Sequence, residues 1–250
     1  MPKLTLLEIT QSILSDMDSD NVNSINDTVE ALQVAEIVKT SYNEIINSRK
    51  WPHLKMMTQL EASGDNTKPV WMQIPTNVSY IDWVKYDKIK TGNTATIYQD
   101  VTCLSPKDFL DIVMQRNEDA TNITEYTDYN GTPVLVITDS APTYYTSFDD
   151  EYIVFDSYDS AVDTTLQKSK TQVEAYKEAV WSSVDTFTPD LPAKAFPYLL
   201  AEAKSAAFTS LKQAPNPKEE QKARRQRTFL ARQKWQQNGG IKKPDYGRHS

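Results

Sequence analysis

The sequence of 250 residues contains few of the residue types on which metal, redox and nucleotide chemistry depend. Its single cysteine, Cys103, excludes an intrachain disulfide and any metal site built from paired cysteines. It has two histidines, His53 and His249, and six glycines, with neither a GxxxxGK nor a GxGxxG phosphate-binding motif. We therefore expect no cofactor and no specific metal site.

Long apolar runs are also missing. The chain has no stretch of about 18 consecutive apolar residues, the length that a membrane helix needs. Its first twenty residues carry one lysine, several acids and no small-residue cleavage site. We expect neither a membrane span nor a secretory signal, and the single cysteine fits a reducing compartment such as a cytoplasm.

Charge is present in both signs but is unevenly distributed. The net charge is −7. From Lys212 to the C-terminus, 11 Lys and Arg residues accompany three acids, whereas the preceding residues hold 16 basic and 31 acidic side chains. The sequence thus predicts an acidic body with a basic C-terminal segment, which is typical of a solvated or partner-facing arm.

Two segments near the N-terminus have the apolar spacing of amphipathic helices. In the first, from Thr5 to Met17, apolar side chains recur every three or four residues. The second is expected to start near Thr28, since Asp27 and Glu30 have the spacing of a capping pair, and to continue to residue 47.

Trp51 and Pro52 follow this second helix directly, and proline forbids its continuation. We interpret the pair as a structural junction between helix and strand region. Trp51 is expected in the core, with its indole N–H bonded to a carbonyl freed at the helix end. The alternative is that Trp51 belongs to a contact surface.

Between residues 54 and 155 the pattern changes to alternating, β-branched and aromatic runs such as VWMQIP, VSYIDWVKY, TATIYQDVT and PVLVITD. They predict strands of an antiparallel sheet or small sandwich. One helix interrupts them, with Ser105 as its N-cap and Pro106 at its first position. Residues 156–190 are polar and are expected to form an exposed hairpin or a long excursion.

The strongest helical pattern covers residues 193–213, which have a broad apolar face. The sequence APNP ends it, and a highly charged helix with few apolar side chains is predicted for 218–238. Such a helix buries little of its own surface and is suited to contact with another molecule. Residues 239–250 are expected to be a flexible tail.

Together these patterns predict an α+β fold, in which a helical bundle built from both chain termini carries an inserted antiparallel β-rich region. The expected parts are an N-terminal helical pair (1–53), a β-rich insertion with one short helix and an exposed hairpin or excursion (54–190), C-terminal helices that complete the bundle (191–238) and a tail (239–250).

Three stretches, in this order, resemble the head-to-tail adaptor proteins of short-tailed bacteriophages, also called tail tubular protein A. They are YNEIINSRKW, DSYDSAVDTTLQKSKTQVEAY and FTPDLPAKAFPYLLAEAKSAAFTSLKQAPNPKEEQKARRQR, and the resemblance spans most of the chain. It implies a virion structural protein at the portal vertex, made in the host cytoplasm, that assembles as a ring of twelve copies. Its implied partners are the portal protein, the tail nozzle protein and genomic DNA, which passes without specific binding.

In these adaptors the C-terminal segment commonly reaches toward the portal, so the matching positions here begin at residue 218. A ring also needs two different surfaces that fit each other. The candidate residues for contact with the portal or a neighbouring subunit are Arg224, Arg225, Arg227, Phe229, Arg232, Lys234, Trp235, Lys242, Lys243, Tyr246 and Arg248. The alternative is an ordinary charged helix that covers its own body.

The sequence is also compatible with two other functions. A tail-associated cell-wall hydrolase would need paired carboxylates, for which Asp149, Asp150 and Glu151 are available, or His53 for a nucleophilic triad. A nucleic-acid-binding module would use the basic C-terminal segment. Adjacent acids in a turn are usually solvated surface, and we expect no enzyme activity.

Overall fold

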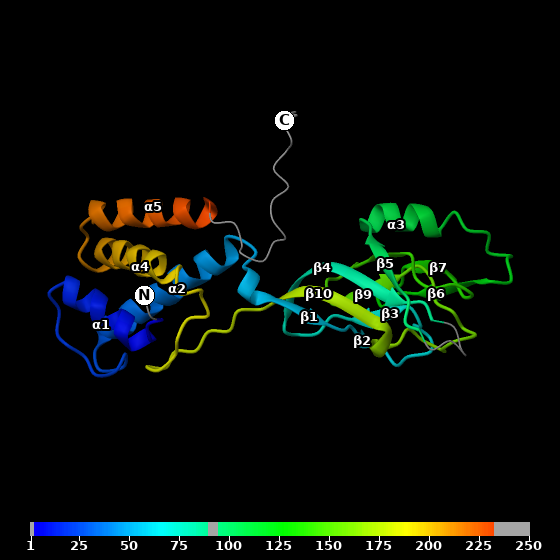
Figure 1. The fold of residues 1–250 in the computed structure, drawn as a ribbon, viewed down its shortest axis with the longest axis horizontal. Helices are drawn as coiled ribbons and strands as arrows, with labels where there is room; N and C mark the ends of the chain where they lie inside the picture. The colour runs from blue at the N-terminus through cyan, green and yellow to red at the C-terminus, as the bar shows by residue number, and fades with distance from the viewer. Residues whose placement is uncertain (1–2, 90–94, 233–250) are drawn as a thin grey trace, which may run out of the picture. The chain divides into compact units, whose positions relative to one another are not determined.

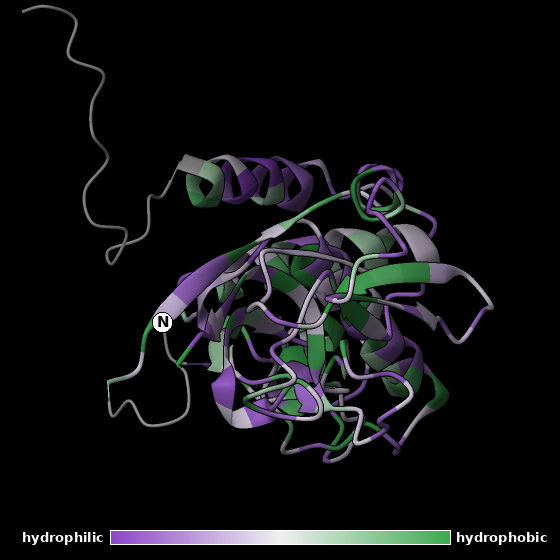
Figure 2. Cartoon of the chain, turned by 90° about the vertical axis from the view of Figure 1, so that its right-hand side faces the viewer, coloured by the Kyte–Doolittle hydropathy of each residue, from purple (hydrophilic) through white to green (hydrophobic). Residues whose placement is uncertain are grey.

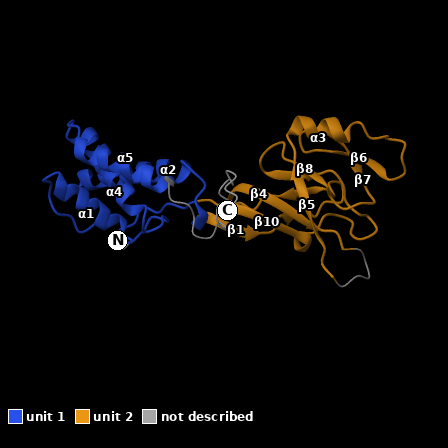
Figure 3. Cartoon of the chain, turned by 45° about the horizontal axis from the view of Figure 1, so that its top comes forward, with its two compact units in different colours: residues 1–53, 179–250 blue, residues 54–178 orange. Residues whose placement is uncertain are grey.

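The computed structural model describes residues 3–89 and 95–232, and the chain divides into two compact units (Figure 3). Unit 1 comprises Met1–His53 and Ala179–Ser250, and unit 2 comprises Leu54–Glu178. Residues 179–190, which the sequence assigned to the β-rich insertion, therefore belong to unit 1.

The predicted fold class is wrong. The chain is a mixed α/β protein whose largest element is a curled eight-stranded sheet, and the described residues form only five α-helices (Figure 1). It is not a helical bundle built from both termini. The sheet is also not purely antiparallel, because β5 (Tyr98–Cys103) and β8 (Tyr144–Thr146) pair in parallel.

The first two helices of unit 1 start at threonine caps. In α1 (Leu6–Asp16), the Thr5 hydroxyl accepts from the Glu8 amide at 3.2 Å, while the Glu8 carboxylate accepts from the Thr5 amide at 2.8 Å. In α2 (Val29–Asn47), Thr28 caps the helix by accepting from Ala31 N. The predicted cap, Asp27, instead accepts from amides of the preceding turn.

The other two helices of unit 1 are α4 (Phe196–Leu211) and α5 (Pro217–Arg232). Helix α4 contacts α1, α2 and α5, and α5 lies on α4 (Figure 1). Lys204 of α4 is buried and donates to the Asp16 carboxylate at the end of α1 at 2.6 Å. This ion pair fixes the position of α4 against α1.

The segment that precedes α4 is tied to the N-terminal helices. Leu6 N donates to Phe187 O at 2.7 Å, and the Asp185 carboxylate accepts from Ile25 N at 2.8 Å. The Trp181 ring lies 5.2 Å from the ring of Tyr42, which is fully buried. These contacts explain why residues 179–190 join unit 1 although their composition is polar.

The sheet of unit 2 has the strand order β1-β10-β4-β5-β8-β9-β3-β2. A separate two-stranded ribbon pairs β6 with β7, and helix α3 (Pro106–Val113) is capped by Ser105 as the sequence predicted. The remaining strands are β1 (Lys55–Thr58), β2 (Glu61–Ala62), β3 (Trp71–Gln73), β4 (Val78–Asp87), β6 (Ile123–Thr127), β7 (Pro133–Ile137), β9 (Tyr152–Phe155) and β10 (Thr171–Lys177), with two 3₁₀ turns at Pro52–Leu54 and Lys168–Lys170.

Strand β10 corrects the prediction of an exposed hairpin or excursion after residue 155. It lies inside the sheet and pairs antiparallel with both β1 and β4. Its alternate residues Thr171, Val173 and Ala175 are buried, and the residues between them are polar or aromatic. The two-residue period was present in the sequence, but the surrounding polar residues hid it.

A buried ion pair connects the turn after α3 to the core of unit 2. The Arg116 guanidinium lies 2.8 Å from the Asp156 carboxylate, and the two side chains are 11% and 4% exposed. Arg116 also donates to Leu135 O at 2.8 Å, and Asp156 accepts from the amides of Thr143 and Tyr144 at 2.9 Å. Through these bonds the ion pair joins the turn after α3 to β7, to the start of β8 and to the end of β9.

Replacing Asp156 by alanine should lower the free energy of unfolding by about 3–5 kcal/mol, because it leaves a buried guanidinium without its partner. Urea denaturation followed by circular dichroism measures the loss. The matched control is Asp119→Ala, an exposed aspartate of the same unit, which should change the free energy by no more than about 0.5 kcal/mol. Equal effects of the two substitutions would contradict the assignment.

Candidate functional site

Helix α5 packs against the rest of unit 1 through few buried side chains. Asn216 accepts from Glu219 N at 3.3 Å at its start, Pro217 occupies its first position, and only Ala223 and Leu230 are buried among its described side chains. Figure 2 shows α5 as a predominantly hydrophilic helix. Such a helix contributes little to the core and presents most of its surface outward.

The outer face of α5 consists of Gln221, Arg224, Arg225, Thr228 and Phe229, which line a shallow groove of about 520 Å³. Phe229 is 52% exposed, an unusual position for a phenylalanine. The Arg224 guanidinium pairs with Glu220 one turn earlier, at 2.5 Å. An aromatic side chain between arginines is the composition enriched at the centres of protein interfaces.

The structure separates the predicted interface residues into groups. Arg224, Arg225 and Phe229 share the outer groove, whereas Arg227 lies at a different cleft. Arg232 is the last residue of α5, and its side chain is outside the described part of the chain. Also outside the described residues are Lys234, Trp235, Lys242, Lys243, Tyr246 and Arg248.

Arg227 contributes to a charged cluster between α5, α4 and α2. Burial raises the pKa of Glu202 on α4, the carboxylate of Glu44 on α2 raises it further, and Arg227 lowers it. Burial also raises the pKa of Tyr198, one turn before Glu202. Sequence reasoning did not single out Tyr198 or Glu202, because nothing but their position on α4 marks them.

The cleft beside Arg227 contains the predicted junction residue Trp51. It has a volume of about 460 Å³ and is lined by residues 48–51 together with Tyr198, Arg227, Leu230 and Ala231. The Arg49 guanidinium lies 3.9 Å above the Trp51 ring and donates to Leu230 O at 2.8 Å. This contact connects the end of α2 to α5.

Trp51 itself is buried, with 1% of its surface exposed. Its indole N–H donates to Ile45 O at 3.2 Å, a carbonyl in the last turn of α2, and Pro52 begins the 3₁₀ turn that follows. Both the burial and the hydrogen bond are as the sequence predicted. Trp51 therefore acts in packing rather than as an exposed contact residue.

The residues considered for catalysis have structural partners. His53 Nε2 donates to Asp190 O at 2.7 Å. The Asp149 carboxylate accepts from Glu151 N and Tyr152 N, which builds the turn before β9, and Asp150 has a positive φ of 62° in that turn. These acids shape a turn, and the arrangement does not place two carboxylates across a substrate cleft.

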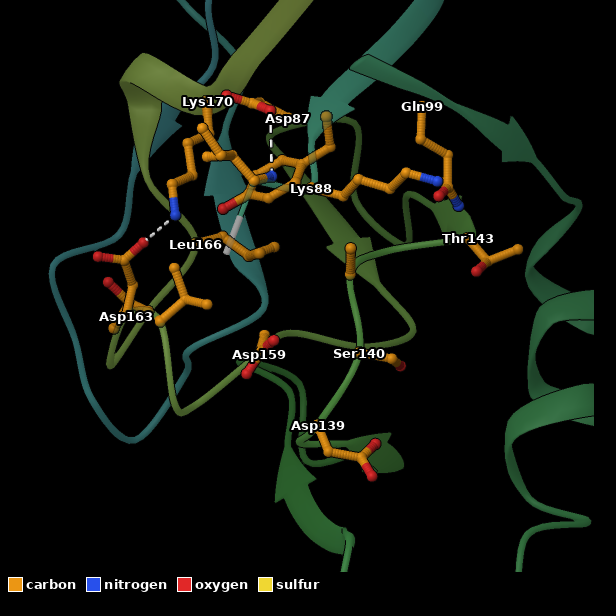
Figure 4. A pocket seen from close by; sticks show the side chains of 15 residues that line it. Asp87, Lys88, Gln99, Asp139, Ser140, Thr143, Asp159, Asp163, Leu166 and Lys170 are labelled. Atoms are coloured by element: carbon orange, nitrogen blue, oxygen red, sulfur yellow. Dashed lines mark hydrogen bonds and ion pairs between the residues drawn. The ribbon is translucent and has the colours of Figure 1, made fainter. Parts of the chain in front are cut away.

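Unit 2 contains a polar cavity of about 300 Å³, shown in Figure 4. Its wall includes Asp87, Asp139, Asp159 and Asp163, each with a local partner. Asp87 accepts from Ile89 N and Ile97 N, Asp139 from the Asn122 amide, Asp159 from Ala161 N, and Asp163 pairs with Lys170. The carboxylates hold the surrounding loops in place.

Within residues 3–89 and 95–232, no three His, Cys, Asp or Glu side chains are grouped so that they could hold a metal ion. In the same ranges, no helix has the length and apolar character to cross a membrane. No protein-family model matches the chain, and no curated protein sequence matches it. The strongest candidate site is the outer face of α5, because it combines exposed arginines with an exposed aromatic ring.

Removing the Trp51 side chain should destabilise unit 1, since the ring is fully enclosed and supports both α2 and Arg49. We expect Trp51→Ala to lower the free energy of unfolding by about 3–5 kcal/mol, measured by urea denaturation. Trp51→Phe should lose less because the ring volume is largely kept. Val180→Ala, at a position that is 74% exposed, is the control and should be near neutral. A near-neutral Trp51→Ala would contradict this packing role.

The raised pKa of Glu202 makes its effect on stability depend on pH. Because the folded state disfavours the ionised carboxylate, Glu202 is destabilising above its folded pKa, and this destabilisation disappears as the pH falls and the carboxyl is protonated. Glu202→Gln should therefore raise the free energy of unfolding at about pH 7 and have little effect at about pH 3. The exposed Glu118→Gln serves as control. A gain that persists unchanged at low pH would exclude the raised pKa as its cause.

Proposed function

We propose that the chain is a head-to-tail adaptor of a short-tailed bacteriophage, a virion structural protein that forms a ring between the portal and the tail nozzle. Twelve copies, the number usual in the family it resembles, would surround the channel through which genomic DNA passes. The protein acts by binding and needs no catalytic residue. Its place is the tail at the portal vertex of the virion.

The observation that supports this proposal most strongly is the outer face of α5. Arg224, Arg225 and Phe229 are directed away from α4 on a helix that buries only Ala223 and Leu230 among its described side chains. A monomer gains nothing in stability from an exposed phenylalanine, whereas a protein contact does. The basic residues that follow α5 in the sequence extend the same charge toward the C-terminus.

DNA is a weaker candidate than protein as the partner of this face. Tight binding of phosphates would hinder the sliding of DNA through a channel, and the chain as a whole has a net charge of −7. Arginines beside an exposed aromatic ring fit an acidic protein surface equally well. The passing DNA is therefore expected to meet the ring without specific binding.

The proposal is tested by mixing the purified full chain with the portal protein from the same genome. We expect a discrete ring-shaped complex by electron microscopy, with binding that weakens as the salt concentration rises. Replacing Lys234, Lys242, Lys243 and Arg248 together by glutamine should weaken portal binding by about tenfold or more, because charge is removed at constant chain length.

The matched control replaces four lysines of unit 2, Lys85, Lys88, Lys107 and Lys177, by glutamine and should bind the portal as the wild type does. The absence of any complex at both low and moderate salt would contradict the adaptor function. Release of cell-wall fragments, abolished by Asp149→Asn or Asp150→Asn, would favour the hydrolase instead.

A further inference from the structure

Unit 1 has segregated its charges into two regions. From Glu8 to Glu36 the sequence contains seven acidic residues and no lysine or arginine. Helix α5 contains six lysines and arginines and two glutamates. Both regions belong to the same compact unit. Three of the seven acids, Asp16, Glu30 and Glu36, pair with Lys204, Lys212 and Lys39, and the other four add negative charge to the subunit that carries the basic helix α5. Regions of opposite charge attract each other when they lie on different copies.

The acidic region includes an exposed apolar pair on α2. Val29 is 72% exposed and Leu32 is 44% exposed, and their spacing of three places them on one face of the helix. The exposed Asp27 precedes them, and the exposed Glu36, which also pairs with Lys39 at 3.2 Å, follows one turn later. We call Asp27, Val29, Leu32 and Glu36 the α2 face.

The α2 face is directed away from the body of unit 1. The opposite side of the helix is buried against α1 and α4 through Ala31, Val34, Ala35, Val38, Ser41, Tyr42, Ile45 and Ile46. Nothing in the packing of α2 therefore requires Val29 and Leu32 to be apolar. Burial of such a pair by a partner removes apolar area from water, at roughly 25 cal/mol per Å².

The outer face of α5 has the complementary composition. Phe229 supplies an exposed ring, Arg225 lies one helical turn before it, and Arg224 lies beside Arg225 in the same groove. The α2 face has an apolar centre with carboxylates on either side, and the α5 face has an apolar centre with guanidinium groups beside it. Opposite charges around matching apolar centres favour one orientation and register of contact.

We propose that the outer face of α5 in one copy binds the α2 face of the next copy. Phe229 packs on Val29 and Leu32, and Arg224 and Arg225 meet the carboxylates of Asp27 and Glu36. Both faces are exposed within a single chain, so they do not cover each other there. The contact joins two different surfaces, and copies linked head to tail through it leave no face free when they close into a ring.

This inference rests on the proposed function, because a closed ring is the assembly that the adaptor requires. The inference assigns the contact between neighbouring subunits to the two helix faces. The contact with the portal is assigned to the segment that follows α5. A nucleic acid would also match the arginines and would stack a base on Phe229. The second copy is favoured because the complementary face is part of the same sequence.

A mixing experiment on the full chain tests the contact. One variant, Arg224→Ala/Arg225→Ala, loses the α5 face and keeps the α2 face. The other, Leu32→Lys/Glu36→Lys, loses the α2 face and keeps the α5 face. All four residues except Leu32 are charged and exposed, and Leu32 is itself 44% exposed, so both variants should fold as the wild type does by circular dichroism.

Sedimentation velocity in reducing buffer measures assembly over a range of concentrations. Wild-type protein should assemble, and each variant alone should associate about tenfold or more weakly. An equimolar mixture of the two variants should form a dimer and stop there, since each copy has one usable face. The matched controls are Lys107→Glu and Asp111→Lys/Ile112→Lys on α3 of unit 2, which should assemble as the wild type does.

Four results would overturn the proposal: wild-type protein that stays monomeric at every concentration, variants that assemble like the wild type, a mixture without dimers, or controls that lose assembly equally. Portal binding is measured separately in the same buffers. If wild-type chains self-associate through these faces but do not bind the portal, the adaptor function is contradicted and the contact between the two faces is supported. If the wild type binds the portal but both variants assemble like the wild type, the adaptor function stands and the proposed contact between the two helix faces is wrong.

Discussion

Helix α5 buries very little of its surface, and the assembly proposed for this chain depends on that exposure. A helix of sixteen residues is held on α4 mainly by Ala223 and Leu230, with Arg49 reaching the carbonyl of Leu230 from the end of α2. Polar helices gain stability chiefly by packing an apolar stripe, and α5 has almost none on its inner side. Its one large apolar ring, Phe229, is on the outer side. The arrangement is understandable if the outer side is covered in an assembly.

The rest of unit 1 supports this arrangement by holding α4 firmly. Lys204 pairs with Asp16, the segment before α4 bonds to the start of α1, and Trp51 closes the end of α2 with its indole bonded to Ile45 O. Unit 2 is stabilised differently, by a sheet core and by the buried pair of Arg116 with Asp156. The carboxylates that line its polar cavity bond to neighbouring loops and hold them in place. The two units thus separate a candidate contact surface from a self-contained β domain.

The sequence predicted the local features that depend on short spacing. The cap of α3 at Ser105, the approximate extent of α1 and α2 and the burial of Trp51 follow from capping, periodicity and the Trp-Pro break. It failed where pairing partners are far apart in the chain. The prediction of an excursion is wrong at strand β10, because the outward side chains of this strand are polar and hide its two-residue period. For the same reason, the sequence did not reveal that an eight-stranded sheet is the largest element of the fold. The charged cluster of Tyr198, Glu202 and Arg227 could not be predicted, because it depends on how α2, α4 and α5 pack together.

Site-specific crosslinking shows whether the outer face of α5 in one copy contacts the α2 face of another. In a Cys103→Ser background, one chain carries Phe229→Cys and a second carries Leu32→Cys. Mild oxidation of the mixture should give a disulfide-linked heterodimer in much higher yield than either chain alone. A yield no greater than that of Phe229→Cys mixed with Ile112→Cys, a similarly exposed apolar position on α3, would show that the two faces do not meet.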